Sequence, residues 1–226
     1  MIAMKNGKFI GVLLIVTLLS VLGGCAEKEV QPIEQDEQQQ LAVDEDAVVR
    51  IEETTFTQAD MAFYTLMQRV KNELNRSEDA ETLQGEALND SNAYWDGQND
   101  LYDNVNVQLQ NLIEIHAMSL LAEEKNYFVP DDKLDQEVLE FNKGIEHHVV
   151  IQDMIQQYGE EDYNLDLRGY MRERMLRDRI AADIEKTVLE ELPDAKEQEL
   201  RYEVNTRYDE LAMEQISSLD RQIFLR

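Results

Sequence analysis

The scarcity of helix-breaking residues constrains this chain more than any other feature. Its 226 residues include only 9 glycines and 3 prolines, and four of the glycines precede residue 25. Glycine and proline disfavour helix interiors most strongly, whereas the abundant Glu, Gln, Leu, Met and Ala favour them. Hydrophobic residues make up 43% of the chain, which is enough for a core. We therefore expect a mainly α fold made of several long helices.

The spacing of apolar residues predicts where those helices lie. Apolar side chains recur at steps of three and four residues, which place them on one helix face. Thr57 and Asp60 resemble a capping box at the start of a first helix. The polar stretch 77–91 predicts a looser segment after it. Further helices are expected over about 92–126, 130–144, 147–158, 161–192 and 195–217.

Two short β-prone runs lie at the ends of this helical region. Residues 48–51 read VVRI, and residues 220–225 read DRQIFL with alternating apolar positions. We expect the two runs to pair as a small two-stranded ribbon that joins the start and the end of the domain. Such a ribbon needs helices packed beneath it, because two strands alone are marginal in water.

The first 25 residues carry a targeting pattern. Lys5 and Lys8 precede the apolar run 9–22, which is shorter than the roughly 20 residues of a membrane-spanning helix. The run leads into Gly24 and Cys25, the only cysteine of the chain. This pattern resembles a bacterial lipoprotein signal peptide with its lipobox.

That resemblance implies a processing route and an address. A peptidase would cleave between Gly24 and Cys25, after diacylglycerol is joined to the Cys25 sulfur, and the freed amine could then be acylated with a fatty acid such as palmitate. The protein would be anchored by lipid at the extracytoplasmic face of the cell membrane, in a Gram-positive cell. Residues 1–24 are then the signal peptide. We expect no cofactor other than this covalent lipid.

The charge of the chain limits its partners. There are 48 acidic and 21 basic residues, so the formal net charge is -27. Nucleic-acid binding needs clustered Lys and Arg, so we expect no nucleic-acid partner. Anionic lipid headgroups repel such a surface, so the lipid on Cys25 must provide the membrane attachment. Residues 25–46 begin with the lipidated Cys25 that the lipoprotein resemblance implies, and their acidic, Gln-rich composition predicts a disordered tether. One helical domain is expected over 47–226.

Four segments of that domain resemble the SurA N-terminal-like family, the peptide-binding helical domain of SurA- and PrsA-type extracytoplasmic foldases. They are residues 57–76 (TQADMAFYTLMQRVKNELNR), 93–127 (AYWDGQNDLYDNVNVQLQNLIEIHAMSLLAEEKNY), 129–138 (VPDDKLDQEV) and 156–163 (QQYGEEDY). The resemblance covers most of residues 48–226. It implies a chaperone- or foldase-like binder of unfolded secreted polypeptides.

One departure from that family concerns catalysis. Its members usually carry a parvulin isomerase domain between the long helices and the last helix. Here the chain passes directly from helix to helix around Pro193, which leaves no room for a parvulin domain. We therefore expect that the protein is not an enzyme, and the resemblance assigns no catalytic residue. Two alternatives stay open, namely a structural or adaptor lipoprotein that docks one folded partner, and a peptidyl-prolyl isomerase by family name only. The oligomeric state is not indicated by the sequence.

Methionine and aromatic side chains are the candidates for peptide binding, because methionine adapts to many partners. The alternative for each is ordinary core packing along the helix seams. The candidates are Tyr64, Met67, Trp95, Tyr102, Met118, Met171 and Met175.

A metal site is not expected from the histidines or the acidic runs. His147 and His148 are adjacent, so on a helix they would point about 100° apart. Asp131 and Asp132 lack the glycine and final glutamate of a calcium loop, and acids at a helix start are favoured by the helix dipole.

Overall fold

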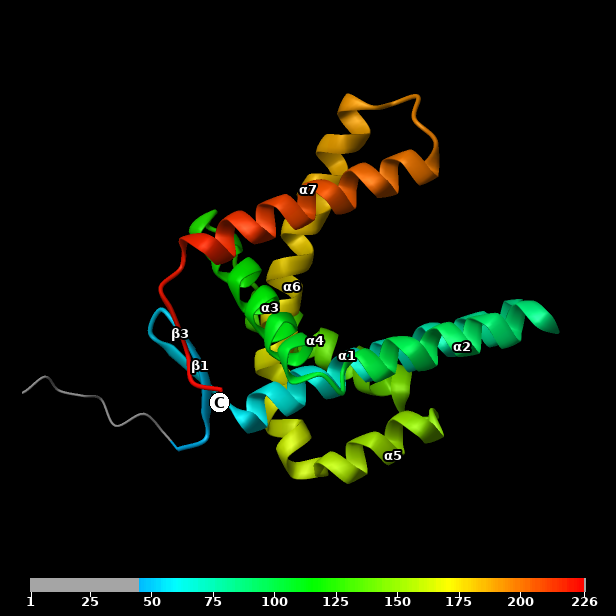
Figure 1. Cartoon of the computed structure of the whole chain (residues 1–226), viewed down its shortest axis with the longest axis horizontal. Coiled ribbons are helices and arrows are strands. Elements are labelled where there is room, and N and C mark those ends of the chain that lie inside the picture. Colours follow the sequence, from blue (N-terminus) through cyan, green and yellow to red (C-terminus); the bar gives the residue numbers. More distant parts are fainter. Residues whose placement is uncertain (1–44, 226) are drawn as a thin grey trace, which may run out of the picture. The chain divides into compact units, whose positions relative to one another are not determined.

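The structure, a computed structural model, describes residues 45–225. The predicted signal peptide, Cys25 and almost all of the predicted tether lie outside the described residues. The described residues form seven helices and three strands, which confirms the mainly α fold (Figure 1). In chain order the elements are β1 (Ala47–Ile51), β2 (Thr54–Thr57), α1 (Gln58–Thr82), α2 (Glu86–Leu101), α3 (Val105–Glu124), α4 (Asp131–Ile145), α5 (Val149–Tyr158), α6 (Glu160–Glu191), α7 (Glu197–Ser218) and β3 (Arg221–Ile223).

The predicted pairing of the two ends of the domain is confirmed, but the ribbon has a third strand. β1 is the central strand, antiparallel to both neighbours, in the order β2-β1-β3. Arg50 faces Gln222 across the β1–β3 pair. β2 was not predicted, because the turn that folds it back contains neither glycine nor asparagine. Glu52 adopts the left-handed φ of 51° there, and its side chain accepts a hydrogen bond from the Asp220 backbone at 2.9 Å.

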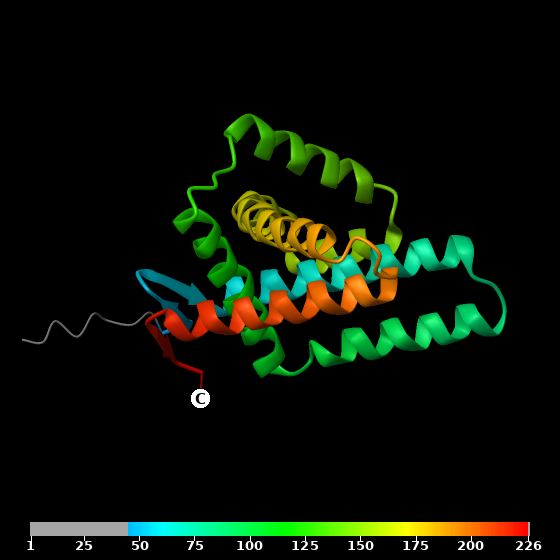
Figure 2. The ribbon, with the colours of Figure 1, turned by 90° about the horizontal axis from the view of Figure 1, so that it is seen from above.

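The predicted start of α1 is confirmed, but the predicted loose segment over 77–91 is wrong. Thr57 and Asp60 form a complete capping box, in which Asp60 accepts from the Thr57 backbone N–H at 2.7 Å. α1 continues to Thr82, and α2 starts at Glu86 and runs back beside it (Figure 2). The polarity of this stretch reflects a polar contact between two helices, since Asp79 accepts from Trp95 Nε1 at 2.9 Å.

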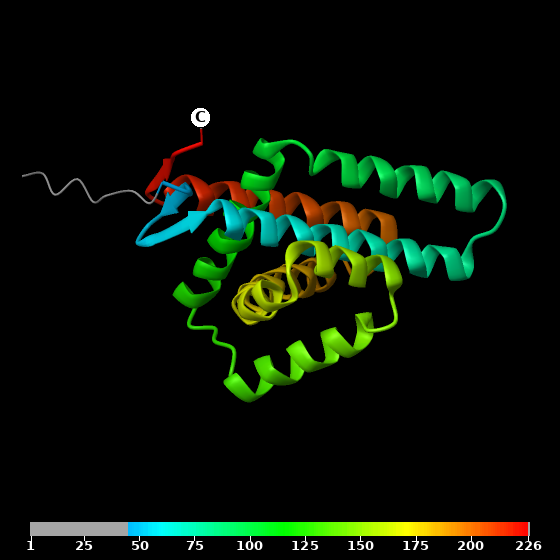
Figure 3. The same ribbon diagram turned by 90° about the horizontal axis from the view of Figure 1, so that it is seen from below.

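The predicted single helix over 92–126 is two helices. α2 ends at Leu101, and α3 begins at Val105 after a sharp turn (Figure 3). Asn104 is the N-cap of α3, and its side chain accepts from the Asn106 backbone N–H at 2.9 Å. Asparagine is a strongly preferred N-cap residue, and here this local signal overrides a continuous apolar pattern.

The core forms where α1, α3 and α6 meet beneath the small sheet. α3 is buried along most of its length and packs chiefly on α6. Aromatic rings of three tyrosines surround Phe63, and Tyr170 meets it edge-on with ring centroids 5.8 Å apart. α6 passes to α7 through the short turn 192–196, as predicted around Pro193. The described chain therefore has no domain inserted at this point.

Candidate functional site

Two of the predicted peptide-binding residues lie fully inside the core. Met118 on α3 and Met171 on α6 are 0% exposed, and they pack among the aliphatic side chains between these helices. A ligand has no access to them in this conformation. Their role in the structure is core packing, which is what helical periodicity most often indicates.

Tyr64 is also buried, within a polar network that links three helices. Its hydroxyl donates to Glu173 on α6, and Glu173 Oε1 lies 2.8 Å from His116 Nδ1 on α3. Burial and the neighbouring Glu173 carboxylate raise the pKa of Tyr64 far above its ordinary value. The network pairs the Tyr64 hydroxyl and His116 Nδ1 with Glu173, whereas the buried His116 Nε2 has no hydrogen-bond partner among the described residues. None of the three residues lines a cavity described below.

Trp95 and Tyr102 belong to the α1–α2 hairpin and its following turn. Both are half-buried, and Trp95 is tied to α1 by the bond from its indole to Asp79. Burial and the Glu114 charge raise the pKa of Tyr102. None of the α2 residues, all of which are described, is buried. The hairpin is instead connected by polar pairs, including Arg76–Asp96 at 2.6 Å and Arg69–Asp103 at 2.7 Å.

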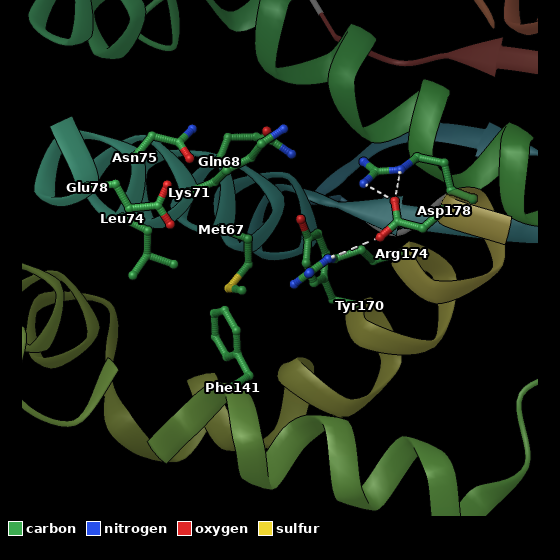
Figure 4. Close-up of a pocket in the computed structure, with 11 residues that line it drawn as sticks. Met67, Gln68, Lys71, Leu74, Asn75, Glu78, Phe141, Tyr170, Arg174 and Asp178 are labelled. Carbon is green, nitrogen blue, oxygen red and sulfur yellow. Dashed lines mark hydrogen bonds and ion pairs between the residues drawn. The ribbon is translucent and has the colours of Figure 1, made fainter. Parts of the chain in front are cut away.

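Met67 lines a cavity of about 390 Å³ between α1, α4 and α6, which we call the cationic cavity (Figure 4). Met67 and Phe141 point toward each other from α1 and α4. The apolar residues that line the cavity are Met67, Leu74, Phe141 and Tyr170. The polar residues that line it are Gln68, Lys71, Asn75, Glu78, Arg174, Arg177 and Asp178.

Three cations converge on this cavity. Arg177 Nη2 lies 2.6 Å from Asp178, and Arg174 Nε lies 3.5 Å from the other oxygen of the same carboxylate. Burial alone would lower the pKa of Arg177, but the Asp178 carboxylate raises it. For Lys71, burial and the Arg177 charge together lower the pKa. Sequence reasoning missed this set, and its only local signal is the spacing of Arg174 and Arg177 on one helix.

Met175 lines a second cavity, of about 370 Å³, at the end of α3 and the start of α4. Tyr127, Val129 and Leu176 provide its apolar wall, and Arg179 lies over the Tyr127 ring at 5.2 Å from its centroid. The structure thus places Met67 and Met175 in separate cavities. The seven predicted residues do not gather in one site.

A third hollow, of about 580 Å³, lies between α1 and α5 and contains none of the seven predicted residues. We call it the α1–α5 groove. Leu66, Val150 and Met154 give it an apolar floor, and Val150 is 53% exposed. Its hydrogen-bonding residues are Thr65, Arg69, Gln108, Asp153 and Gln157. Its only signal in the sequence is the apolar run Val149-Val150-Ile151 at the start of a short helix, because one helix face cannot bury all three side chains.

The acidic start of α4 is an interhelical contact. Asp131 lies 2.8 Å from Arg168 on α6, and Asp135 lies 2.9 Å from the same guanidinium. The hydrogen bond from Arg168 and its charge lower the pKa of Asp131. Within residues 45–225, no group of three His, Cys, Asp or Glu is arranged to hold a metal ion.

Comparison of the chain with protein-family models, with curated proteins and with solved structures finds no match. Among the described helices, none combines the length and the apolar composition needed to cross a membrane.

Proposed function

We propose that this protein is a lipid-anchored extracytoplasmic binder of unfolded secreted polypeptides, with a chaperone- or foldase-like role. The α1–α5 groove is the observation that carries the proposal. It combines an apolar floor with side-chain amides, a hydroxyl and charged groups along its edges. An extended polypeptide presents the same two features, apolar side chains and backbone groups that must stay hydrogen-bonded.

The composition of the groove also suits many different sequences. Met154 has an unbranched, polarizable side chain that adjusts to the shape of its neighbours. The amides of Gln108 and Gln157 can both donate and accept, so they impose no single pattern on a ligand backbone. The resemblance to the SurA N-terminal-like family and the lipobox at Cys25 agree with this role at the membrane surface.

The test is suppression of aggregation by a soluble fragment of residues 45–226, since the described residues fall within one compact unit. The fragment is mixed with a reduced, carboxymethylated secretory protein, and light scattering is followed. Val150→Glu places a charge on the apolar floor and should abolish suppression. Val149→Glu is the matched control, because Val149 is 72% exposed and does not line the groove. Equal suppression by both variants, or none by the parent fragment, would refute the proposal.

A second candidate function is docking of one folded partner, and α2 favours it. This helix has no buried residue, and it leaves Tyr94 56% and Leu101 51% exposed. Exposed aromatic residues on a surface are enriched at protein interfaces. Pull-down from membranes with the lipidated chain distinguishes the two functions. A single stoichiometric partner that is lost on Tyr94→Ser supports docking. Many substoichiometric polypeptides support client binding in the α1–α5 groove.

A proline isomerase activity is the remaining alternative, and we expect none. An assay on a proline-containing peptide should give the uncatalysed rate, which corresponds to tens to hundreds of seconds.

A further inference from the structure

The cationic cavity has the opposite sign of charge to the rest of the chain. The protein carries a formal net charge of -27, yet Lys71, Arg174 and Arg177 meet in one cavity with two carboxylates, Asp178 and Glu78. Asp178 is already shared between the two arginines. In so acidic a chain, a cavity lined by three cations and two carboxylates is a local site for an anion.

Lys71 is the least compensated of the three cations. Among the described residues, none has a carboxylate within 4.0 Å of its ammonium group. Burial and the Arg177 charge lower its pKa, although the Asp178 and Glu114 carboxylates act in the opposite direction. Lys71 nevertheless remains exposed to solvent on one side, as a ligand-binding group must.

The apolar part of the cavity wall lies beside the cationic part. Met67 is only 3% exposed, and it faces Phe141 across the cavity (Figure 4). The Arg174 guanidinium lies 6.0 Å from the centroid of the Phe141 ring, so the cationic and apolar walls touch at this point. A ligand that fills the cavity must therefore carry an anionic group directly beside an apolar one.

We propose that the cationic cavity binds a carboxylate joined to an apolar side chain, and that its ligand is the C-terminal residue of a polypeptide. An α-carboxylate and its own side chain share one Cα, which matches the adjacent walls. Planar guanidinium groups suit carboxylates, and charge-assisted hydrogen bonds of this kind are the strong ones. The volume, about 390 Å³, is at the small end for ligand pockets, which fits a chain end better than a chain passing through.

This site is separate from the α1–α5 groove. Successive residues of a helix are rotated by about 100°. The α1 residues of the groove (62, 65, 66 and 69) and those of the cavity (67, 68, 71, 74, 75 and 78) therefore lie on opposite faces of α1. The inference therefore goes beyond the proposed function and does not depend on it.

The experiment measures binding of fluorescein-labelled peptides to the 45–226 fragment by fluorescence polarisation. The probe ends in Leu-Phe with a free carboxylate. Two peptides are compared with it. The first is the same peptide with a C-terminal amide, and the second also ends in an amide but carries one Glu next to Phe. We expect the free carboxylate to bind roughly tenfold or more tightly than the plain amide, given the strength of charged hydrogen bonds. If the Glu amide binds as well as the free carboxylate, the C-terminal residue is overturned as the ligand, and a side-chain carboxylate takes its place.

Two variants assign the binding to the cavity. Lys71→Met and Arg174→Met should each weaken binding of the free-carboxylate probe by about tenfold. Lys186→Met is the control, because Lys186 is exposed on α6 and lines none of the cavities described. Circular dichroism and thermal melting check that each variant folds, and Val150→Glu should leave this binding unchanged. Equal affinity for acid and plain amide, or unchanged affinity in folded Lys71→Met, would overturn the proposal whether or not the groove binds clients.

Discussion

His116 Nδ1 and Glu173 Oε1 lie 2.8 Å apart, which joins α3 to α6 inside the core. Tyr64 on α1 donates to the other oxygen of Glu173, so a single carboxylate holds three helices together. Phe56 of β2 packs edge-on against the His116 ring, with centroids 4.8 Å apart. This partly buried polar network connects the small sheet to the helices that shape both proposed sites.

Glu173→Gln tests how much that network contributes to the free energy of unfolding. The amide oxygen accepts more weakly than a carboxylate oxygen, and the amide NH2 group cannot accept from Tyr64 or His116 at all. We expect a loss of about 1–3 kcal/mol in the free energy of unfolding, measured by urea denaturation. Glu185→Gln, at an exposed position of the same helix, should change it by less than about 0.5 kcal/mol. Equal midpoints for the two variants would contradict the network's role.

Tyr163 should make the domain sensitive to alkali. Burial raises the pKa of its hydroxyl above the ordinary value of 10.0. Below pH 10 the Tyr163 hydroxyl is neutral in both the folded and the unfolded chain, so its ionisation does not reduce the free energy of unfolding. As pH rises past 10, the unfolded chain releases this proton while the folded chain retains it, so stability falls.

The measurement is the urea midpoint as a function of pH. Tyr163→Phe removes one such group and should make the decline above pH 10 less steep. Tyr202→Phe, at a position that is 71% exposed, should leave the slope unchanged. A Tyr163→Phe slope identical to that of the parent would show that this hydroxyl ionises freely in the folded state.

Asp79 should control the attachment of α2. Its carboxylate accepts from Ser91 at 2.5 Å and from the Trp95 indole at 2.9 Å, and these bonds lower its pKa. Asp79→Ala should speed amide hydrogen exchange over 86–101. It should also shift the fluorescence emission to the red, and this emission reports on Trp95 alone because the chain has 1 tryptophan. Asp90→Ala is the control, at an exposed position of α2. Unchanged emission would mean that other contacts hold this helix.

Cys25→Ser tests the membrane address. If Cys25 is the lipid-bearing residue, the variant should leave the membrane fraction or accumulate as an unprocessed precursor with a higher mass. Both outcomes are read by fractionation and mass spectrometry. A variant that is cleaved normally and stays in the membrane fraction would rule out the lipobox.

Local signals in the sequence were enough for some elements and not for others. The capping box of Thr57 and Asp60 was predictable because both partners lie within one turn. The break at Asn104 was not, because apolar residues on both sides continue the same helical pattern. The 77–91 stretch was misjudged for a related reason: α2 packs on α1 through Asp79, Arg76 and other polar residues, and a polar helix interface has the composition of a loop.

The sites depend on contacts that the sequence does not show. Lys71 and Arg174 are about a hundred residues apart, and only the packing of α1 on α6 brings them into one cavity. Periodicity places Met118 and Met171 on helix seams, but it cannot tell a seam that is filled from one that is open. In this fold the seams that carry Met118 and Met171 are filled, because both side chains are fully buried.

Hydrogen–deuterium exchange with a bound client tests the central claim most directly. The 45–226 fragment is measured alone and with a reduced, carboxymethylated secretory protein in excess. Binding in the α1–α5 groove should slow exchange over 149–158 and 62–69 together, and Val150→Glu should abolish this protection while Val149→Glu retains it. Exchange that is unchanged over both segments in the presence of client would contradict polypeptide binding at the groove.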